Sequence, residues 1–160
     1  MTEEMITISM TVNSEKVVKT IPVRTHLVDF IRTELGFTGS HLGCEHGICG
    51  ACSVRVDGDV VRGCLMLAAQ VDGCEVVTIE GITDTGEIRD LQDTFVERNA
   101  LQCGFCTPGM LMTAAELLTQ KKPQSREEIR EFISGNYCRC TGYHAIIDAI
   151  ETVNNARLKR

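Results

Sequence analysis

The chain has 160 residues, of which 43% are hydrophobic and 4% are aromatic, and its formal net charge is −6. This length and hydrophobic content can bury the core of one domain or of two small ones. The acidic balance and the lack of tryptophan disfavour a nucleic-acid-binding surface, which needs clustered Lys and Arg and aromatic stacking platforms.

The first half of the sequence predicts a small β-rich unit with one helix. Alternating apolar and polar residues over 5–21 predict a hairpin of two strands. Apolar residues at helical spacing over 27–35 predict a helix that ends at a glycine. Asp57 and Gly58 form a strong hairpin signal between two further strands, and a last strand is expected over 76–79. Short strands around one helix indicate a compact α+β unit.

A polar joint without hydrophobic periodicity occupies residues 81–87 and marks a domain boundary. The sequence therefore predicts two domains, residues 1–81 and residues 82–160. In the second domain, four amphipathic segments with short connections predict a small helical bundle. These segments cover residues 88–100, 108–118, 126–134 and the stretch from 146 to 153.

Local capping signals support two of these helices. Thr107 before Pro108 is expected to be an N-cap, because proline is favoured at the first helical position. Ser125 and Glu128 have the spacing of a capping box, in which each side chain bonds the other residue's backbone amide. The two signals predict where the second and third helices begin.

No export or membrane signal accompanies these elements. No apolar run approaches the roughly 20 residues that span a bilayer. The N-terminus begins acidic over residues 1–4 and then alternates, unlike a secretory signal with its basic start and apolar stretch. The sequence thus predicts a cytoplasmic protein without a membrane span, unless a partner chain carries an export signal for a whole complex.

Nine cysteines are too many for a chain of this size in a reducing compartment unless they have a specific role. The odd count, the lack of a signal peptide and the clear hydrophobic periodicity disfavour a disulfide framework. Most of the cysteines are clustered and flanked by glycines, whereas Cys74 stands alone and is interpreted as a packed or surface thiol. Metal binding is therefore the expected role of the other eight.

The first cysteine group has the spacing of a plant-type ferredoxin loop, which holds a [2Fe–2S] cluster. Its members are Cys44, Cys49, Cys52 and Cys64. Three glycines in the loop let the backbone approach a cluster without a Cβ in the way. Amide groups freed by such a loop can point at the cluster sulfurs and stabilise the charge added by reduction. The hairpin at Asp57 would return the chain so that the fourth ligand reaches the loop.

The second cysteine group consists of two short pairs, each in a turn next to a predicted helix. Its members are Cys103, Cys106, Cys138 and Cys140. Two such turns that meet could hold four thiolates around one cluster, and thiolates are favoured near helix N-termini. A structural zinc site is the main alternative here, because paired cysteines also bind zinc. The sequence lacks the tight cysteine run typical of a [4Fe–4S] site, which disfavours that cluster. A Rieske centre is disfavoured as well, because it needs two histidines and only His46 lies inside a cysteine loop.

With both groups in place, the sequence resembles the iron–sulfur subunit of the xanthine dehydrogenase family, the molybdenum hydroxylases. The resemblance covers roughly residues 5–155 and rests on three segments, 43–52, 102–109 and 136–143, whose order and separation match the family. It implies an α+β protein with an N-terminal ferredoxin-like β-grasp domain and a C-terminal four-helix bundle. This agrees with the elements expected from periodicity.

The resemblance also implies roles for individual residues. The first cysteine group would hold the [2Fe–2S] cluster nearer the flavin, and the second would hold the buried [2Fe–2S] cluster nearer the molybdopterin. Residues matching Gln102 and Cys140 contact the pterin in this family, so these two are expected pterin contacts. No residue of the chain is expected to be catalytic, because it would relay electrons without transforming substrate.

The expected partners follow from the same resemblance. They are a large molybdopterin-binding subunit and a medium FAD-binding subunit, arranged as a dimer of heterotrimers. The sequence contains neither a G-x-G-x-x-G motif nor a P-loop, so no dinucleotide site is expected on this chain. A relay between two partners would need apolar contact surfaces, which predicts exposed hydrophobic residues on the isolated chain. A free ferredoxin-like carrier and a zinc-stabilised interaction module are the alternative functions.

Overall fold

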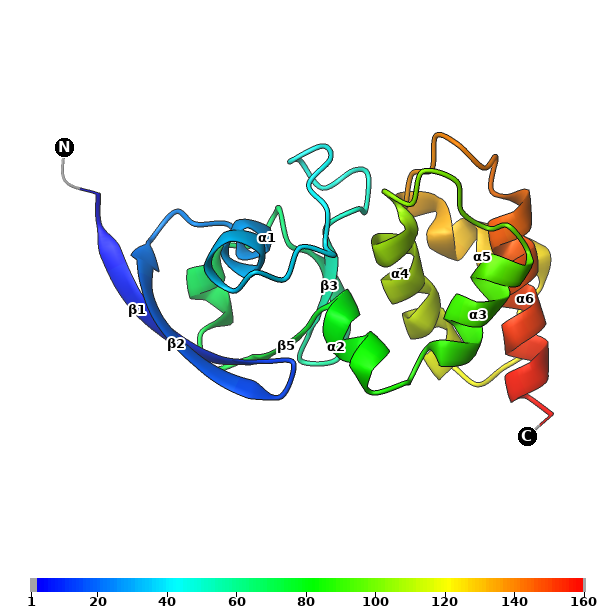
Figure 1. Ribbon diagram of the computed structural model, residues 1–160, viewed down its shortest axis with the longest axis horizontal. Helices are drawn as coiled ribbons and strands as arrows, with labels where there is room; N and C mark the ends of the chain where they lie inside the picture. Colours follow the sequence, from blue (N-terminus) through cyan, green and yellow to red (C-terminus); the bar gives the residue numbers. More distant parts are fainter. Residues whose placement is uncertain (1–2, 160) are drawn as a thin grey trace.

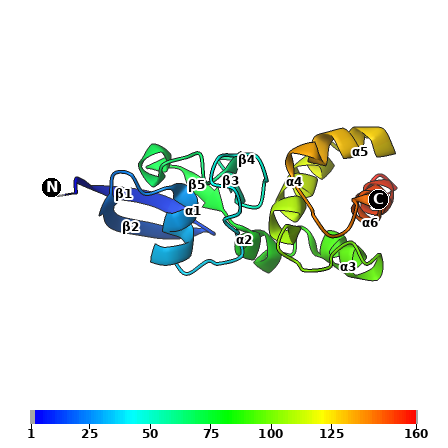
Figure 2. The same ribbon diagram turned by 90° about the horizontal axis from the view of Figure 1, so that it is seen from above.

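The computed structural model describes residues 3–159 as two lobes that lie side by side, one built on a sheet and one on helices (Figure 1). A view turned by 90° shows the same division, with α2 (Ile79–Asp84) and α4 (Thr107–Thr119) where the lobes meet (Figure 2). The chain begins at the far end of the sheet lobe and ends in the helical lobe. The architecture is the expected α+β arrangement.

The sheet lobe contains a mixed five-stranded sheet in the order β2-β1-β5-β3-β4. Its strands are β1 (Met5–Val12), β2 (Glu15–Pro22), β3 (Ser53–Val56), β4 (Asp59–Arg62) and β5 (Glu75–Val77). β1 pairs antiparallel with β2, and β3 pairs antiparallel with β4, which confirms both predicted hairpins. β5 joins them, parallel to β1 and antiparallel to β3. Both hairpin turns have two central residues with positive φ, the geometry that matches the twist of the strands.

One helical segment covers the sheet. It consists of α1 (Leu27–Asp29), which continues as the wider-turned η1 (Phe30–Glu34). Phe30 and Ile31 are fully buried against the inner face of the sheet, where Ile8 and Met10 of β1 also point. Gly36, with a φ of +77°, follows this segment, as the sequence predicted. A short 3-10 turn, η2 (Ala68–Val71), completes the same core.

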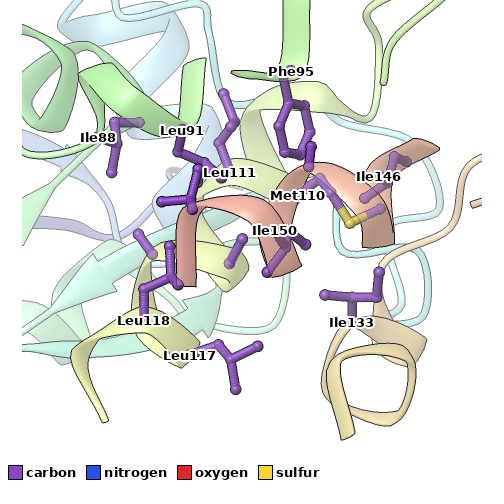
Figure 3. Close-up of a cluster of buried hydrophobic side chains, with 14 of the residues drawn as sticks. Ile88, Leu91, Phe95, Met110, Leu111, Leu117, Leu118, Ile133, Ile146 and Ile150 are labelled. Atoms are coloured by element: carbon purple, nitrogen blue, oxygen red, sulfur yellow. The ribbon is translucent and has the colours of Figure 1, made fainter. Parts of the chain in front are cut away.

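The helical lobe is built around α4. The other helices of this lobe are α3 (Arg89–Glu97), α5 (Arg126–Phe132) and α6 (His144–Arg157), with the short η3 (Ile133–Gly135) between the last two. Figure 3 shows Leu91 and Phe95 of α3, Met110 of α4 and Ile150 of α6 in one cluster of buried side chains. α4 is apolar on almost every face, which suits a helix surrounded by neighbours. Among the described residues, no helix is long and apolar enough to cross a membrane.

The joint expected at residues 81–87 is partly helical. Ile79 and Ile82 of α2 lie one helical turn apart, and both are buried in the core of the helical lobe. The same burial ends β5 at Val77, two residues earlier than predicted. The sequence reasoning missed this helix because it contains only two apolar residues between polar ones. The division into residues 1–81 and 82–160 stays a prediction, and its boundary lies inside α2.

One of the two predicted helix caps is present in the structure and the other is not. Ser125 and Glu128 form the capping box, with the amide of each residue donating to the side chain of the other at 2.7 and 3.2 Å. Thr107 is not an N-cap, because the carbonyl of Cys106 already accepts the first helical hydrogen bond, from the amide of Met110 at 3.0 Å. α4 therefore begins at Thr107, one residue earlier than predicted.

Replacing Ile150 by alanine should test the importance of the helical core. Ile150 is 0% exposed, so the change is expected to lower the free energy of unfolding by about 2–5 kcal/mol through lost burial and a cavity. Val96→Ala is a matched control, because Val96 is 69% exposed and its truncation should change the free energy by less than about 0.5 kcal/mol. Urea titration followed by circular dichroism would measure both. Equal stability of the two variants would contradict this packing.

Candidate metal centres

The first thiol group consists of the four cysteines of the first cysteine group, and three of them lie in the loop before β3. This loop lies between the two lobes (Figure 1). Cys44 and Cys49 belong to this loop, and the amide of Cys49 donates to Cys44 Sγ at 3.4 Å. Cys52 directly precedes β3, and Cys64 follows β4 after one residue, so the β3–β4 hairpin brings these two side by side. Their thiols are hydrogen-bonded to each other. The structure thus places Cys44 beside Cys49 and Cys52 beside Cys64, and that these four hold one cluster stays a prediction.

The electrostatic environment differs across this group. The amide of Cys49 is the largest cause that lowers the pKa of Cys44 to about 6, and the amides of His46 and Ile48 add to it. Burial is the main cause that raises the pKa of Cys52 to about 11, and negative charge on a neighbouring cysteine would raise it further. Thiolate formation is therefore favoured at the open edge of the group and opposed at its buried back. A bound cation would reverse that penalty.

The second thiol group lies where two turns of the helical lobe meet. Cys103 and Cys106 precede α4, and Cys138 and Cys140 precede α6. The thiol of Cys140 donates to Cys103 Sγ at 3.5 Å, and the thiols of Cys106 and Cys138 are also hydrogen-bonded. Two sulfurs on one tetrahedral metal ion lie about 3.8 Å apart when the bonds are about 2.3 Å. Each turn therefore contributes one thiol to each of two close pairs.

Burial and nearby donors also set the pKa values in this group. Burial is the main cause that raises the pKa of Cys106 to about 12. Burial opposes ionisation of Cys138 as well, but hydrogen bonds from the Thr141 hydroxyl at 3.1 Å and amide at 3.5 Å outweigh it, so its pKa is lowered. The amide of Cys138 donates to the phenol oxygen of Tyr143 at 2.8 Å. This contact fixes the turn against the start of α6.

The two groups differ in exposure. Cys52 and Cys64 are buried, whereas Cys103 and Cys140 are exposed, as is the neighbouring Gln102. Within residues 3–159, no three His, Cys, Asp or Glu side chains are arranged to hold a single metal ion. Cys74 lies outside both groups, and a hydrogen bond to the Asp57 carboxylate raises the pKa of its thiol.

The backbones of the two cysteine regions are in direct contact. The amide of Tyr137, the residue before Cys138, donates to the carbonyl of Cys49 at 2.8 Å. His41 Nδ1 bonds the carbonyl of Phe105 at 2.7 Å, and the two rings stack with centroids 4.7 Å apart. His41 therefore links the first loop to the turn before α4. Sequence reasoning missed these bridging contacts, because they join residues that are far apart in the chain.

Exposed apolar side chains lie on the cysteine-bearing segments, as expected for a chain that docks against partners. Ile48 and Leu65 are 47% and 61% exposed and belong to the region of the first group. Phe105 and Tyr137 are 48% and 56% exposed and flank cysteines of the second group. Leu65 also covers the loop, since a Cβ built on Gly47 would lie 2.4 Å from Leu65 Cδ1.

Comparison with known protein families supports the assignment of both halves. Residues 4–100 match the family described as 2Fe-2S iron-sulfur cluster binding domain, and residues 78–151 match the [2Fe-2S] binding domain. The two matches overlap at α2 and α3. Together they include all eight cysteines of the two thiol groups.

Individual relatives cover nearly the whole chain. Caffeine dehydrogenase subunit gamma of Pseudomonas sp. strain CBB1 is 51% identical over 92% of this chain and 90% of that protein. The nicotinate dehydrogenase small FeS subunit of Eubacterium barkeri is 43% identical over 91% of this chain and 92% of that protein. The xanthine dehydrogenase iron-sulfur-binding subunit of Escherichia coli O157:H7 is 40% identical over 92% of this chain and 93% of that protein.

Solved structures show the same fold. The quinoline 2-oxidoreductase structure from Pseudomonas putida 86 contains a chain with a TM-score of 0.90 and 46% identity, matched over 97% of both chains. The aldehyde oxidoreductase of Desulfovibrio gigas gives a TM-score of 0.85 at 39% identity over 95% of this chain, which spans 17% of that longer chain. This chain therefore belongs to the xanthine dehydrogenase family, as one of its small [2Fe–2S] iron–sulfur subunits, and serves electron transfer in an oxidoreductase.

Proposed function

We propose that the chain carries two [2Fe–2S] clusters and relays electrons between a molybdopterin site and FAD, both held by partner subunits. The ligands of the first cluster are Cys44, Cys49, Cys52 and Cys64, and those of the second are Cys103, Cys106, Cys138 and Cys140. The observation that supports the proposal is that the eight cysteines form four close pairs, two in each predicted group, and that the backbones of the two cysteine regions are hydrogen-bonded.

The chemistry of the donor set fits such clusters. Thiolates are the usual ligands of a [2Fe–2S] cluster, which supplies one-electron oxidation and reduction when bound. In the second group, the pairs Cys103–Cys140 and Cys106–Cys138 each suit one iron. Hydrogen bonds to ligand sulfurs are already present, from the amide of Cys49 in the first group and from Thr141 in the second. Such bonds stabilise negative charge and tune the reduction potential.

We base the orientation of the chain between its two partners on which side chains near each thiol group are exposed. The second group is open at Cys103, Cys140 and Gln102, so we assign this edge to the molybdopterin subunit, with Gln102 and Cys140 as pterin contacts. The first group presents Ile48 and Leu65 on its outer side, and we assign this region to the FAD subunit. No residue of this chain has a catalytic role in the proposal.

Assembly and substrate class follow from the relatives. One relative is called subunit gamma and another a small FeS subunit, which supports a complex with further subunits. We take these to be a large and a medium subunit, assembled with this chain as a dimer of heterotrimers in the cytoplasm. Caffeine, nicotinate and quinoline, from which three of these relatives take their names, are all nitrogen heterocycles. A nitrogen heterocycle is therefore the proposed substrate class of the complex, selected by its catalytic subunit.

Replacing Cys103 by serine should remove one cluster and leave the other. Reduced [2Fe–2S] clusters are paramagnetic, so the wild-type complex is expected to give two distinguishable electron paramagnetic resonance (EPR) signals. The Cys103 variant should lose one of them, because the hydroxyl is a poorer ligand for iron than a thiolate. Cys74→Ser is the matched control, since Cys74 lies outside both groups, and it should keep both signals. Two unchanged signals in Cys103→Ser would contradict the assignment of this ligand.

Gentle purification of the tagged chain from its native host should separate the three candidate functions. The proposal predicts two larger co-purifying chains with molybdenum and flavin, and about four iron and four labile sulfide per copy of this chain. A free carrier would purify alone with iron. A colourless protein with zinc and no sulfide would identify a structural module and refute the relay.

A further inference from the structure

A single buried amide joins the two cysteine regions. Asn136 is 1% exposed, and its Nδ2 donates to the carbonyl of Gly50 at 3.2 Å. Its Oδ1 accepts from the Thr113 hydroxyl at 3.0 Å and from Arg62 Nη2 at 3.3 Å. Asn136 itself lies in the turn before Cys138, and its partners Gly50, Thr113 and Arg62 lie in the first loop, in α4 and in β4. The amide therefore ties the turn before Cys138 to the first loop, to α4 and to β4.

The partners of Asn136 lie next to expected cluster ligands. Gly50 directly follows Cys49, and Asn136 lies two residues before Cys138. Arg62, two residues before Cys64, reinforces the junction by donating to the carbonyl of Gly135 at 2.9 Å. A shift of the Asn136 turn relative to Gly50 would therefore move ligands of one group relative to the other.

The backbones around this amide leave little space for such a shift. A Cβ built on Gly50 would lie 2.6 Å from the carbonyl oxygen of Gly135, and the φ of Gly50 is +73°. A Cβ built on Gly109, at the start of α4, would lie 2.2 Å from the carbonyl oxygen of Gly50. Both distances are shorter than side chains tolerate, so only glycine permits this approach. The junction is close-packed, and the Asn136 side chain is hydrogen-bonded at both its Oδ1 and its Nδ2.

We propose that Asn136 is a positioning residue which, with the contact of Gly109 on Gly50, sets the separation and relative orientation of the two clusters. This inference rests on the proposed two-cluster function. Electron transfer between two centres and their magnetic interaction both fall steeply with distance, so a small displacement has a measurable effect. A supporting residue held by packing and several hydrogen bonds keeps a site within the required tolerance.

The test compares Asn136→Asp with a control variant in the purified complex. Aspartate keeps the acceptor for Thr113 and Arg62 but lacks the amide that donates to Gly50. The control, Asn154→Asp, changes a 3% exposed amide whose Nδ2 donates to the carbonyl of Lys122, away from both groups. Iron, sulfide and EPR signals report cluster content, and the splitting of the fully reduced EPR spectrum reports the distance between clusters.

Asn136→Asp is expected to keep both clusters, to alter this splitting and to slow electron transfer between the clusters by roughly tenfold or more, while Asn154→Asp behaves like wild type. Gly109→Ala should have the same effect, because its Cβ wedges α4 away from Gly50. If either variant keeps both clusters but shows wild-type splitting and rate, the inference is overturned. If one of the two variants loses a cluster, the splitting and rate of the other variant decide the test. If both variants lose a cluster, the junction is needed for the cysteine turns to fold, and the positioning role is overturned. A wild-type complex without a second cluster would instead refute the proposed function.

Discussion

The constraint on which the structure depends is the backbone contact between the two cysteine regions. The carbonyl of Cys49 accepts the amide of Tyr137 at 2.8 Å, and this bond joins the loop of the sheet lobe to a turn of the helical lobe. α4 must then lie directly against that loop, which requires glycine at position 109. A helix in this position has neighbours on all sides, so it is apolar almost throughout. The core of the helical lobe is arranged around this placement.

A second constraint is electrostatic. Four thiolates in one place repel one another, and burial raises the pKa of Cys52 to about 11 and that of Cys106 to about 12. Amide and hydroxyl donors work in the opposite direction at Cys44 and Cys138. Thiolates on the buried sides are therefore stabilised only when a cation neutralises them, and binding of the cation is coupled to proton release. The protein stabilises thiolate charge with hydrogen-bond donors at Cys44 and Cys138, whereas the charge of the buried thiolates is stabilised by the bound cation.

Much of the fold and of the site could be predicted from the sequence because the relevant signals are local. Turn residues such as Asp57 and the capping box at Ser125 act within a few residues, and the cysteine spacings indicate both proposed ligand groups. The α2 helix was missed because its two isoleucines gain their stability from a core that forms elsewhere in the chain. Asn136 was missed for a similar reason, since its bond to Gly50 spans 86 residues and a polar side chain in a turn normally faces solvent.

The two thiol groups are completed to different degrees by this chain alone. Cys52 and Cys64 are buried by the sheet lobe itself, whereas Cys103 and Cys140 remain at the surface beside an exposed glutamine. A low-dielectric environment strengthens hydrogen bonds to a cluster and excludes water, so the open group needs another surface to provide it. In the proposed complex this surface belongs to the molybdopterin subunit. Electrons would then cross the subunit boundary at the open group and pass between it and the more buried group.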